Sequence, residues 1–166
     1  MAMNKYLSMI TLSVNGLNVP IKRHSIDEWI RKYDPHICCL QATHLRAKDQ
    51  LRLKVKGWKQ IFQSNGQEKK AGVPILISDK IDFKRRAIKR DPEGHFIILK
   101  GRIHQENISI VNIYALSMVA PKYIKKILED FEKGNDSNII LVGDLTPQYQ
   151  KWTDLPNKIS TRILCH

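Results

Sequence analysis

The residues that decide the fold are Ile37-Cys38-Cys39-Leu40-Gln41-Ala42-Thr43-His44, an apolar run that ends in polar side chains. A short apolar run bounded by turn residues is typical of a strand that is buried on both faces. Cys38 and Cys39 would then point to opposite faces of the sheet, so they could not easily hold one metal ion. We therefore interpret both as small buried hydrophobic residues.

The chain before this run predicts one strand and one helix. Residues 9–14 favour a buried strand, which ends at the turn Asn15-Gly16. A helix follows, with Asn18 as a candidate cap and Pro20 in its first turn. It is expected to end at Asp34-Pro35. Its apolar face, at helical spacing, consists of Ile26, Trp29, Ile30 and Tyr33.

The chain after this run predicts mainly strands. Residues 46–59 are basic and lack a clear period, and an edge strand is expected over residues 58–63. Pro74 lies inside the next expected strand, residues 73–78, where a proline would remove a hydrogen-bond donor. Three successive antiparallel strands are then expected over residues 83–89, 96–102 and 108–114.

The last expected elements are a helix after Pro121 and a strand over residues 138–142. The apolar face of that helix consists of Ile124, Ile127, Leu128 and Phe131. Helices that alternate with strands, together with a run of hairpin-linked strands, predict an α/β fold: a layered sandwich with mixed, mostly antiparallel sheets.

The overall charge points to an anionic partner. The 166 residues fit one domain, and 28 Lys and Arg against 16 Asp and Glu give a formal net charge of +12. Nucleic acid is the first candidate, and an acidic membrane surface or solubility alone are the alternatives. The three cysteines form no disulfide framework, and no signal peptide or membrane span is visible. We therefore expect a nuclear or cytoplasmic protein that is not secreted and has no membrane partner.

Polar residues at strand ends are where layered α/β proteins place their sites. Such residues occur at 13–16, 41–44, 114–117 and 143–146. Hydrolysis of a phosphodiester needs a hard cation held by carboxylates. Asp144 is the only carboxylate in these places, so the residues predict a poor Mg²⁺ site.

The same strand ends resemble motifs of the endonuclease/exonuclease/phosphatase superfamily. They read V-N-G at 14–16, Q-A-T-H at 41–44, N-I-Y-A at 112–115 and V-G-D-L-T at 142–146. Within that superfamily the chain resembles the endonuclease domain of LINE-type retrotransposons, nearly continuously from about Met9 to Asp144. The resemblance implies a four-layered α/β sandwich of the DNase I type, dependence on Mg²⁺, and nicking of DNA to prime reverse transcription.

The chain departs from the family at the catalytic positions. The family's Q-E-T carries the main metal-ligating Glu, and Ala42 stands in its place. Tyr114 and Asp144 are retained as catalytic remnants. The family's terminal S-D-H, with its catalytic His, has no counterpart after Thr146. Positions where the family has Asn are occupied by Ser13, Ser117 and Thr146.

These departures predict a protein that holds no metal and does not cut. Losing one electrostatic contact to a transition state typically costs about 10²- to 10³-fold in rate, and losing the metal removes charge neutralisation and orientation together. The first hypothesis is a retrotransposon-derived, inactive endonuclease-like protein with residual sequence-independent DNA or RNA binding. The alternatives are an active Mg²⁺-dependent nicking endonuclease, and a protein-interaction module or relic without molecular activity.

Several of these residues have a second interpretation. Asp144 is either a catalytic remnant or a turn-forming aspartate, and Tyr114 is either a phosphate contact or a half-buried core aromatic residue. His44 could replace the lost base, although a surface histidine is the commoner case. The basic residues expected to contact phosphate, rather than to form only a solvated face, are Lys22, Arg23, Lys69, Lys70, Arg85, Arg86, Lys89 and Arg90.

The resemblance also bears on domain organisation. Residues 1–146 are expected to form an incomplete domain of the superfamily, and residues 147–166 a divergent segment. The superfamily has two facing sheets, so without the family's last third apolar surface and strand edges would be uncovered. We therefore expect marginal stability, with a protein partner as one way to cover that surface.

Overall fold

The structure is a computed structural model that describes residues 7–67, 71–114, 125–127, 129 and 138–144. Within these ranges the elements with complete bounds are one α-helix, one 3₁₀ helix and eight strands, and residues 125–127 and 129 are also helical. They follow in the order β1 (Met9–Ser13), α1 (Pro20–Tyr33), β2 (Ile37–Gln41), η1 (Ala47–Arg52), β3 (Gln60–Phe62), β4 (Ile75–Ile77), β5 (Phe83–Arg90), β6 (Phe96–Ile103), β7 (Glu106–Tyr114) and β8 (Ile139–Asp144).

The strands form two four-stranded sheets, with the orders β1-β2-β4-β3 and β5-β6-β7-β8. In the first sheet β1 and β2 are parallel, while β4 is antiparallel to both β2 and β3. In the second sheet β5, β6 and β7 form the expected antiparallel run, and β8 is parallel to β7. The predicted α/β sandwich with mixed, mostly antiparallel sheets is therefore confirmed.

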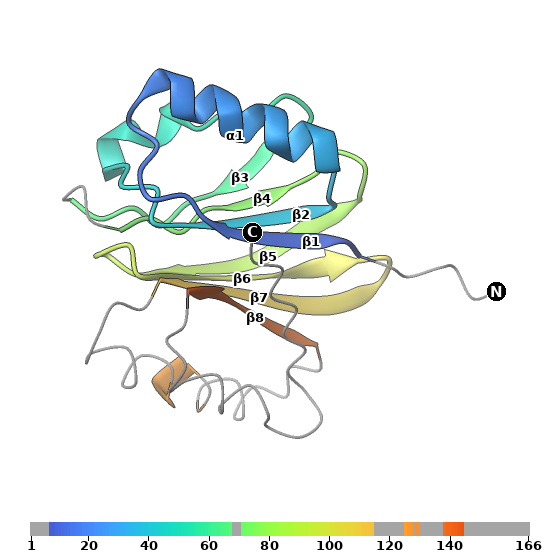
Figure 1. Cartoon of the computed structure of the whole chain (residues 1–166). Helices are drawn as coiled ribbons and strands as arrows, with labels where there is room; N and C mark the ends of the chain where they lie inside the picture. Colours follow the sequence, from blue (N-terminus) through green and yellow to red (C-terminus); the bar gives the residue numbers. More distant parts are fainter. Residues whose placement is uncertain (1–6, 68–70, 115–124, 128, 130–137, 145–166) are drawn as a thin grey trace.

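The sheets stack face to face (Figure 1). Helix α1 covers the outer face of the first sheet, and the helical residues 125–127 and 129 lie below the second sheet. One apolar cluster fills the space between the sheets and another lies under α1. Cys39 belongs to the first cluster and Cys38 to the second, as alternation along a strand requires. Burial raises the pKa of the Cys38 thiol to about 12, which suits an inert core residue.

Helix α1 has the predicted bounds but not the predicted cap. It begins at Pro20, whose missing N–H is not needed in the first turn. The N-cap is Val19, without a side-chain hydrogen bond, because the Asn18 side chain is turned away and Nδ2 donates to the carbonyl of His44 at 2.8 Å. The helix ends at Asp34 in a left-handed conformation, with φ of 46°.

Tertiary packing changed several sequence predictions. Residues 47–52 form a 3₁₀ helix that was not predicted. Trp58 was expected in the edge strand but lies in a turn, where its N–H donates to the carbonyl of Val55 at 3.1 Å. Pro74 was expected inside a strand but precedes β4, and its carbonyl accepts a hydrogen bond from the Leu40 N–H of β2 at 3.1 Å. Ile127 of the expected second helix is helical and buried, whereas Ile124, Leu128 and Phe131 lie outside the described residues.

In the part of the chain that the structure describes, no helix combines the length and the apolar character needed to cross a membrane.

Candidate functional site

The ends of four strands meet at one edge of the sandwich. Ser13 at the end of β1 lies opposite Gln41 at the end of β2, and Tyr114 of β7 lies opposite Asp144 of β8. The two pairs belong to different sheets, but β2 packs against β7 and β8. The predicted remnants and the lost positions Ser13 and Ala42 are therefore gathered together, in what we call the strand-end edge.

A buried hydrogen-bond network joins the two sheets directly beneath this edge. Gln41 Nε2 donates to Asn112 Oδ1 at 2.7 Å and to Thr11 Oγ1 at 2.8 Å. Asn112 Nδ2 donates in turn to the carbonyls of Leu40 and Pro74, at 2.8 and 2.9 Å. Asn112 has no solvent exposure, so each bond matters to stability. Its role was missed from the sequence, although an asparagine within an apolar strand was a visible signal.

Ala42 occupies the position next to Gln41 and offers no metal ligand. It is 2% exposed and belongs to the apolar cluster between the sheets. Its backbone is left-handed, with φ of 57°, and its carbonyl accepts a hydrogen bond from the Gly16 N–H at 2.6 Å. The backbone at this position is thus fixed by neighbouring loops, while the side chain contributes only a methyl group.

His44 lies two residues further on, in the same loop. Burial lowers the pKa of its imidazole, and the nearby charge of Lys22 lowers it further. Its backbone is also left-handed, with φ of 57°. A lowered pKa favours the neutral ring, which can accept a proton or a hydrogen bond. The expected surface histidine is therefore a partly buried one, and its suggested role as a replacement base stays a prediction.

The structure describes the other predicted site residues to different extents. Tyr114 is 8% exposed and packs in the cluster between the sheets, and its part in phosphate contact stays a prediction. Ser13 is exposed. The backbone of Asp144 ends β8, whereas its side chain, Ser117 and Thr146 lie outside the described parts.

The family-implied Mg²⁺ does not fit the side chains that are described. In this part of the chain no group of three or more His, Cys, Asp or Glu residues could hold a metal ion. At the strand-end edge the amides of Gln41 and Asn112 bond to each other, and Ala42 replaces the carboxylate. Hard divalent ions require oxygen ligands, above all carboxylates. We therefore assign no metal chemistry to these residues.

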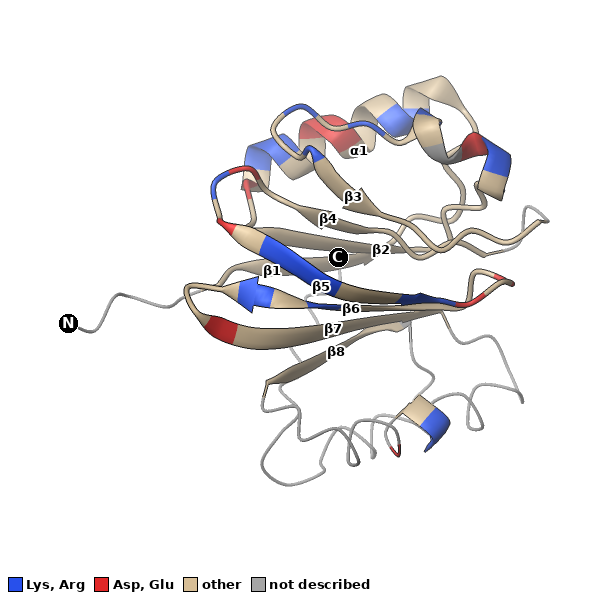
Figure 2. Ribbon diagram, turned by 180° about the vertical axis from the view of Figure 1, so that it is seen from behind, with Lys and Arg blue, Asp and Glu red and all other residues tan. Residues whose placement is uncertain are grey.

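The predicted phosphate-contacting residues separate into two groups. Lys22 and Arg23 lie beside the strand-end edge and donate to backbone carbonyls of residues 15, 17 and 18 at 2.8–2.9 Å. These bonds hold the loop that follows β1. Lys69 and Lys70 lie outside the described residues. The remaining cations lie on β5, which Figure 2 shows as the most strongly basic strand.

Strand β5 forms an edge of the second sheet, and five of its eight residues are Lys or Arg. A β-bulge interrupts its pairing between Arg85 and Ala87, which turns the side chain of Arg86 out of the regular alternation. Arg86 Nη1 donates to Asn107 Oδ1 at 3.0 Å, and Arg90 Nε donates to the carbonyl of Gln63 at 2.8 Å. Charged edge strands also discourage aggregation, so the charge of β5 has two compatible explanations.

Comparison with known proteins identifies the family and the fold of this arrangement. A model of the endonuclease/exonuclease/phosphatase family matches residues 10–145. Similar solved structures include a D. rerio TDP2 humanized by 14 mutations (16% identity, TM-score 0.67), a truncated Caenorhabditis elegans TDP2 (17%, 0.62) and the AP endonuclease LMAP from Leishmania major (18%, 0.54). In that order, the matches cover 90%, 86% and 76% of this chain but 67%, 64% and 46% of the others. The likeness establishes the DNase I-like fold.

Proposed function

The chain belongs to the endonuclease/exonuclease/phosphatase family, and on that premise we propose that it is an endonuclease-like domain that binds nucleic acid without cutting it. Its finer resemblance, to LINE-type retrotransposon endonucleases, supports a retrotransposon origin. We propose residues 1–146 as the extent of the family domain and residues 147–166 as a divergent segment. The nucleic acid would be held by its phosphates, without a sequence preference.

The observation that carries the loss of cutting is the buried methyl group of Ala42. The resemblance assigns the main metal-ligating carboxylate to this position, and Ala42 is 2% exposed beside the inter-sheet network. Without a metal, a phosphodiesterase of this type loses charge neutralisation and substrate orientation together. The backbone scaffold around position 42 is intact, so the loss is chemical rather than architectural.

The observation that supports nucleic-acid binding is the charge of β5. Its cations are exposed and no acidic residue interrupts them. Lys and Arg that neutralise phosphates supply most sequence-independent affinity for nucleic acid. A related structure, D. rerio TDP2, was solved in complex with a single-strand DNA product, which supports nucleic acid as the ligand class of this scaffold.

A plasmid-nicking assay tests the absence of catalysis. Supercoiled plasmid incubated with the protein and Mg²⁺ or Mn²⁺ should yield no nicked circles above the protein-free background. Nicking that disappears in Asp144→Asn would overturn the proposal and establish the active-endonuclease alternative. Nicking that is equal in Asp144→Asn would identify a contaminating nuclease, which a further purification step must then remove before the assay is scored.

Salt-dependent binding tests the nucleic-acid part. The Kd for a duplex of arbitrary sequence should weaken steeply between about 50 and 200 mM salt, with a log–log slope of roughly one per phosphate contact. Arg85→Gln/Arg86→Gln should lower that slope by about two, equally for unrelated sequences. The matched control is Lys32→Gln/Lys56→Gln, which removes the same charge from exposed positions away from β5. A Kd insensitive to salt, or equal slopes in both double variants, would contradict phosphate contact by β5.

The proposed retrotransposon origin has its own test in genomic DNA. A LINE-type insertion should place remnants of reverse-transcriptase coding sequence in the same orientation near this coding region. A locus without any such remnant would argue against this origin while leaving the family membership intact.

A further inference from the structure

A pocket unrelated to the strand-end edge lies beside β3, the edge strand of the first sheet. Its volume is about 450 Å³, and it is lined by Leu51, Leu53, Lys54, Val55, Trp58, Lys59, Ile61, Gln63 and Arg90. This volume falls within the range of about 300–1,000 Å³ that is typical of small-molecule sites. Its apolar part is formed mainly by Leu53, Val55, Trp58 and Ile61.

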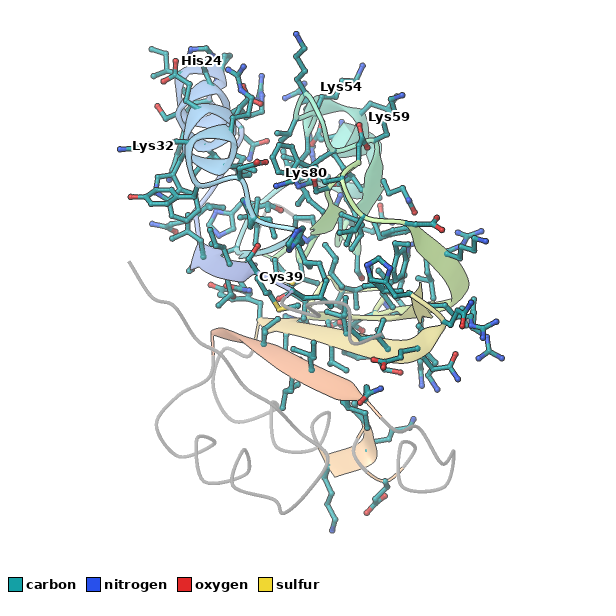
Figure 3. The ribbon with its side chains drawn as sticks, turned by 90° about the vertical axis from the view of Figure 1, so that its right-hand side faces the viewer. His24, Lys32, Cys39, Lys54, Lys59 and Lys80 are labelled. Carbon is teal, nitrogen blue, oxygen red and sulfur yellow. The ribbon has the colours of Figure 1, made fainter. Side chains whose placement is uncertain are left out.

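The polar part of the lining is cationic. Lys54, Lys59 and Arg90 all contribute, and none of the described residues that line the pocket is acidic. Figure 3 shows Lys54 and Lys59 near each other beside the segment that leads into β3. Arg90 is already held in place, because its Nε donates to the carbonyl of Gln63 at 2.8 Å. The pocket therefore offers preorganised positive charge next to an apolar surface.

Trp58 contributes to the apolar wall of the pocket. The residue is 4% exposed, and its indole Nε1 is a buried donor without a hydrogen-bond partner. Two hydrogen bonds to Asp79 fix the backbone around Trp58. The backbone N–H of Asp79 donates to the Gly57 carbonyl at 2.8 Å, and the Lys59 N–H donates to Asp79 Oδ1 at 3.0 Å. The indole therefore forms a rigid part of the pocket wall, with its N–H inside the protein.

We propose that this pocket binds a nucleoside monophosphate. The apolar side chains that line the pocket suit a flat aromatic base, and the lysines and arginine suit a dianionic phosphate. An inorganic anion would leave the apolar surface uncovered, and an uncharged aromatic molecule would leave the cations unused. A nucleotide matches both halves of the lining.

This inference extends the proposed function from phosphate contact to recognition of a base. Because Arg90 belongs to both β5 and the pocket, a nucleotide seated here would lie at the end of the basic strand. The two ideas are nevertheless separable. A free mononucleotide can bind the pocket of a protein that does not bind duplex DNA, and duplex binding along β5 does not require the pocket.

The test is an NMR titration of the full ¹⁵N-labelled chain with deoxyadenosine 5′-monophosphate. The chain has three tryptophans, and Trp58→Phe identifies the Trp58 indole signal by its disappearance. That signal should move and saturate during the titration. Lys54→Gln/Lys59→Gln should weaken binding by about tenfold or more, because each charged hydrogen bond contributes about that factor. Lys32→Gln/Lys56→Gln, with the same net charge, should bind like the unmodified protein.

Parallel titrations with other ligands distinguish a nucleotide site from a general anion site and from a protein-docking groove. A Trp58 signal that stays still at millimolar nucleotide overturns the proposal. Equal shifts with inorganic phosphate at the same affinity would reduce the pocket to a general anion site and also overturn it. Saturation by an acidic peptide with apolar side chains, but not by the nucleotide, would make it a protein-docking groove. Loss of duplex binding with retained mononucleotide binding would refute the proposed function alone.

Discussion

Gln41 and Ala42 are neighbours in the chain, yet they belong to two regions with different physical demands. Gln41 is part of the buried network between the sheets, where its amide bonds to Thr11 and Asn112. Ala42 begins the strand-end edge, where the family resemblance places a charged ligand. The network requires complete hydrogen bonding, whereas a metal site requires concentrated negative charge that is costly to bury. A scaffold can therefore keep its buried hydrogen-bond network after it has lost a metal site.

We expect the largest loss of stability from a substitution in the buried hydrogen-bond network. Asn112→Leu would remove the side-chain donor from the buried carbonyl of Leu40 and one of the two donors from that of Pro74, which keeps the Leu40 N–H, and would leave the Gln41 amide without one acceptor. We expect a loss of about 3–5 kcal/mol in the free energy of unfolding, measured by urea denaturation. Asn107→Leu, an exposed position on the same strand, should change stability by less than about 0.5 kcal/mol. Equal losses in the two variants would remove the network's special role.

The next largest loss of stability is expected from a substitution that changes the shape of the strand-end edge. A Cβ atom on Gly143 would lie 1.9 Å from the carbonyl oxygen of Ile113, on a backbone with φ of 147°. Gly143→Ala should therefore cost about 2–3 kcal/mol, since backbone atoms of a paired strand cannot easily move away. Gly57→Ala provides the control, because φ is also positive at 93° but nothing lies within 4 Å of its Cβ position. If both variants were equally stable by thermal unfolding, the edge would be more plastic than its packing indicates.

Ala42→Glu tests the cost of charge at the edge. A carboxylate at this buried position should lower the free energy of unfolding by about 2 kcal/mol at pH 8. Burial would raise the folded-state pKa of this new carboxyl, so the penalty should grow as the pH rises through the ordinary value and shrink at low pH. Ala42→Gln is the matched control, with a loss that is independent of pH. A Glu variant as stable as the Gln variant at pH 8 would show that the edge tolerates charge.

The smallest change in stability is expected from the protonation of His44. Its pKa is lowered in the folded state, so the unfolded chain takes up a proton first as the pH falls. This proton uptake should therefore lower the free energy of unfolding only as the pH falls below about 6.5, the pKa of His44 in the unfolded chain. Above that pH it should have no effect. In an NMR titration the His44 pKa should lie below 6.5 and rise in Lys22→Gln, because the neighbouring charge contributes to the shift. An unchanged pKa in Lys22→Gln would leave burial as its sole cause.

Prediction from sequence succeeded where one local pattern carried enough information. Apolar periodicity predicted α1, the prolines at 20 and 35 predicted its ends, and the antiparallel run β5–β7 followed from three successive strand-like segments separated by turns. It failed for the cap at Asn18 and the turn at Trp58. In both cases a partner distant in sequence decides the conformation: the carbonyl of His44 for Asn18, and the Asp79 side chain that holds the 55–59 turn. Local patterns carry no information about such partners.

The sequence by itself determined that the chain is a basic α/β sandwich and that Ala42 stands where its resemblance places a metal-ligating carboxylate. Both conclusions depend on residue identity and period. Only the tertiary structure decided that Asn112 bonds the two sheets together beneath Ala42, and that Lys54, Lys59 and Arg90 share one pocket with Trp58. The reason is physical. A hydrogen bond between β2 and β7, or a pocket shared by β3 and β5, depends on how two sheets stack, and stacking brings together residues that no local period relates.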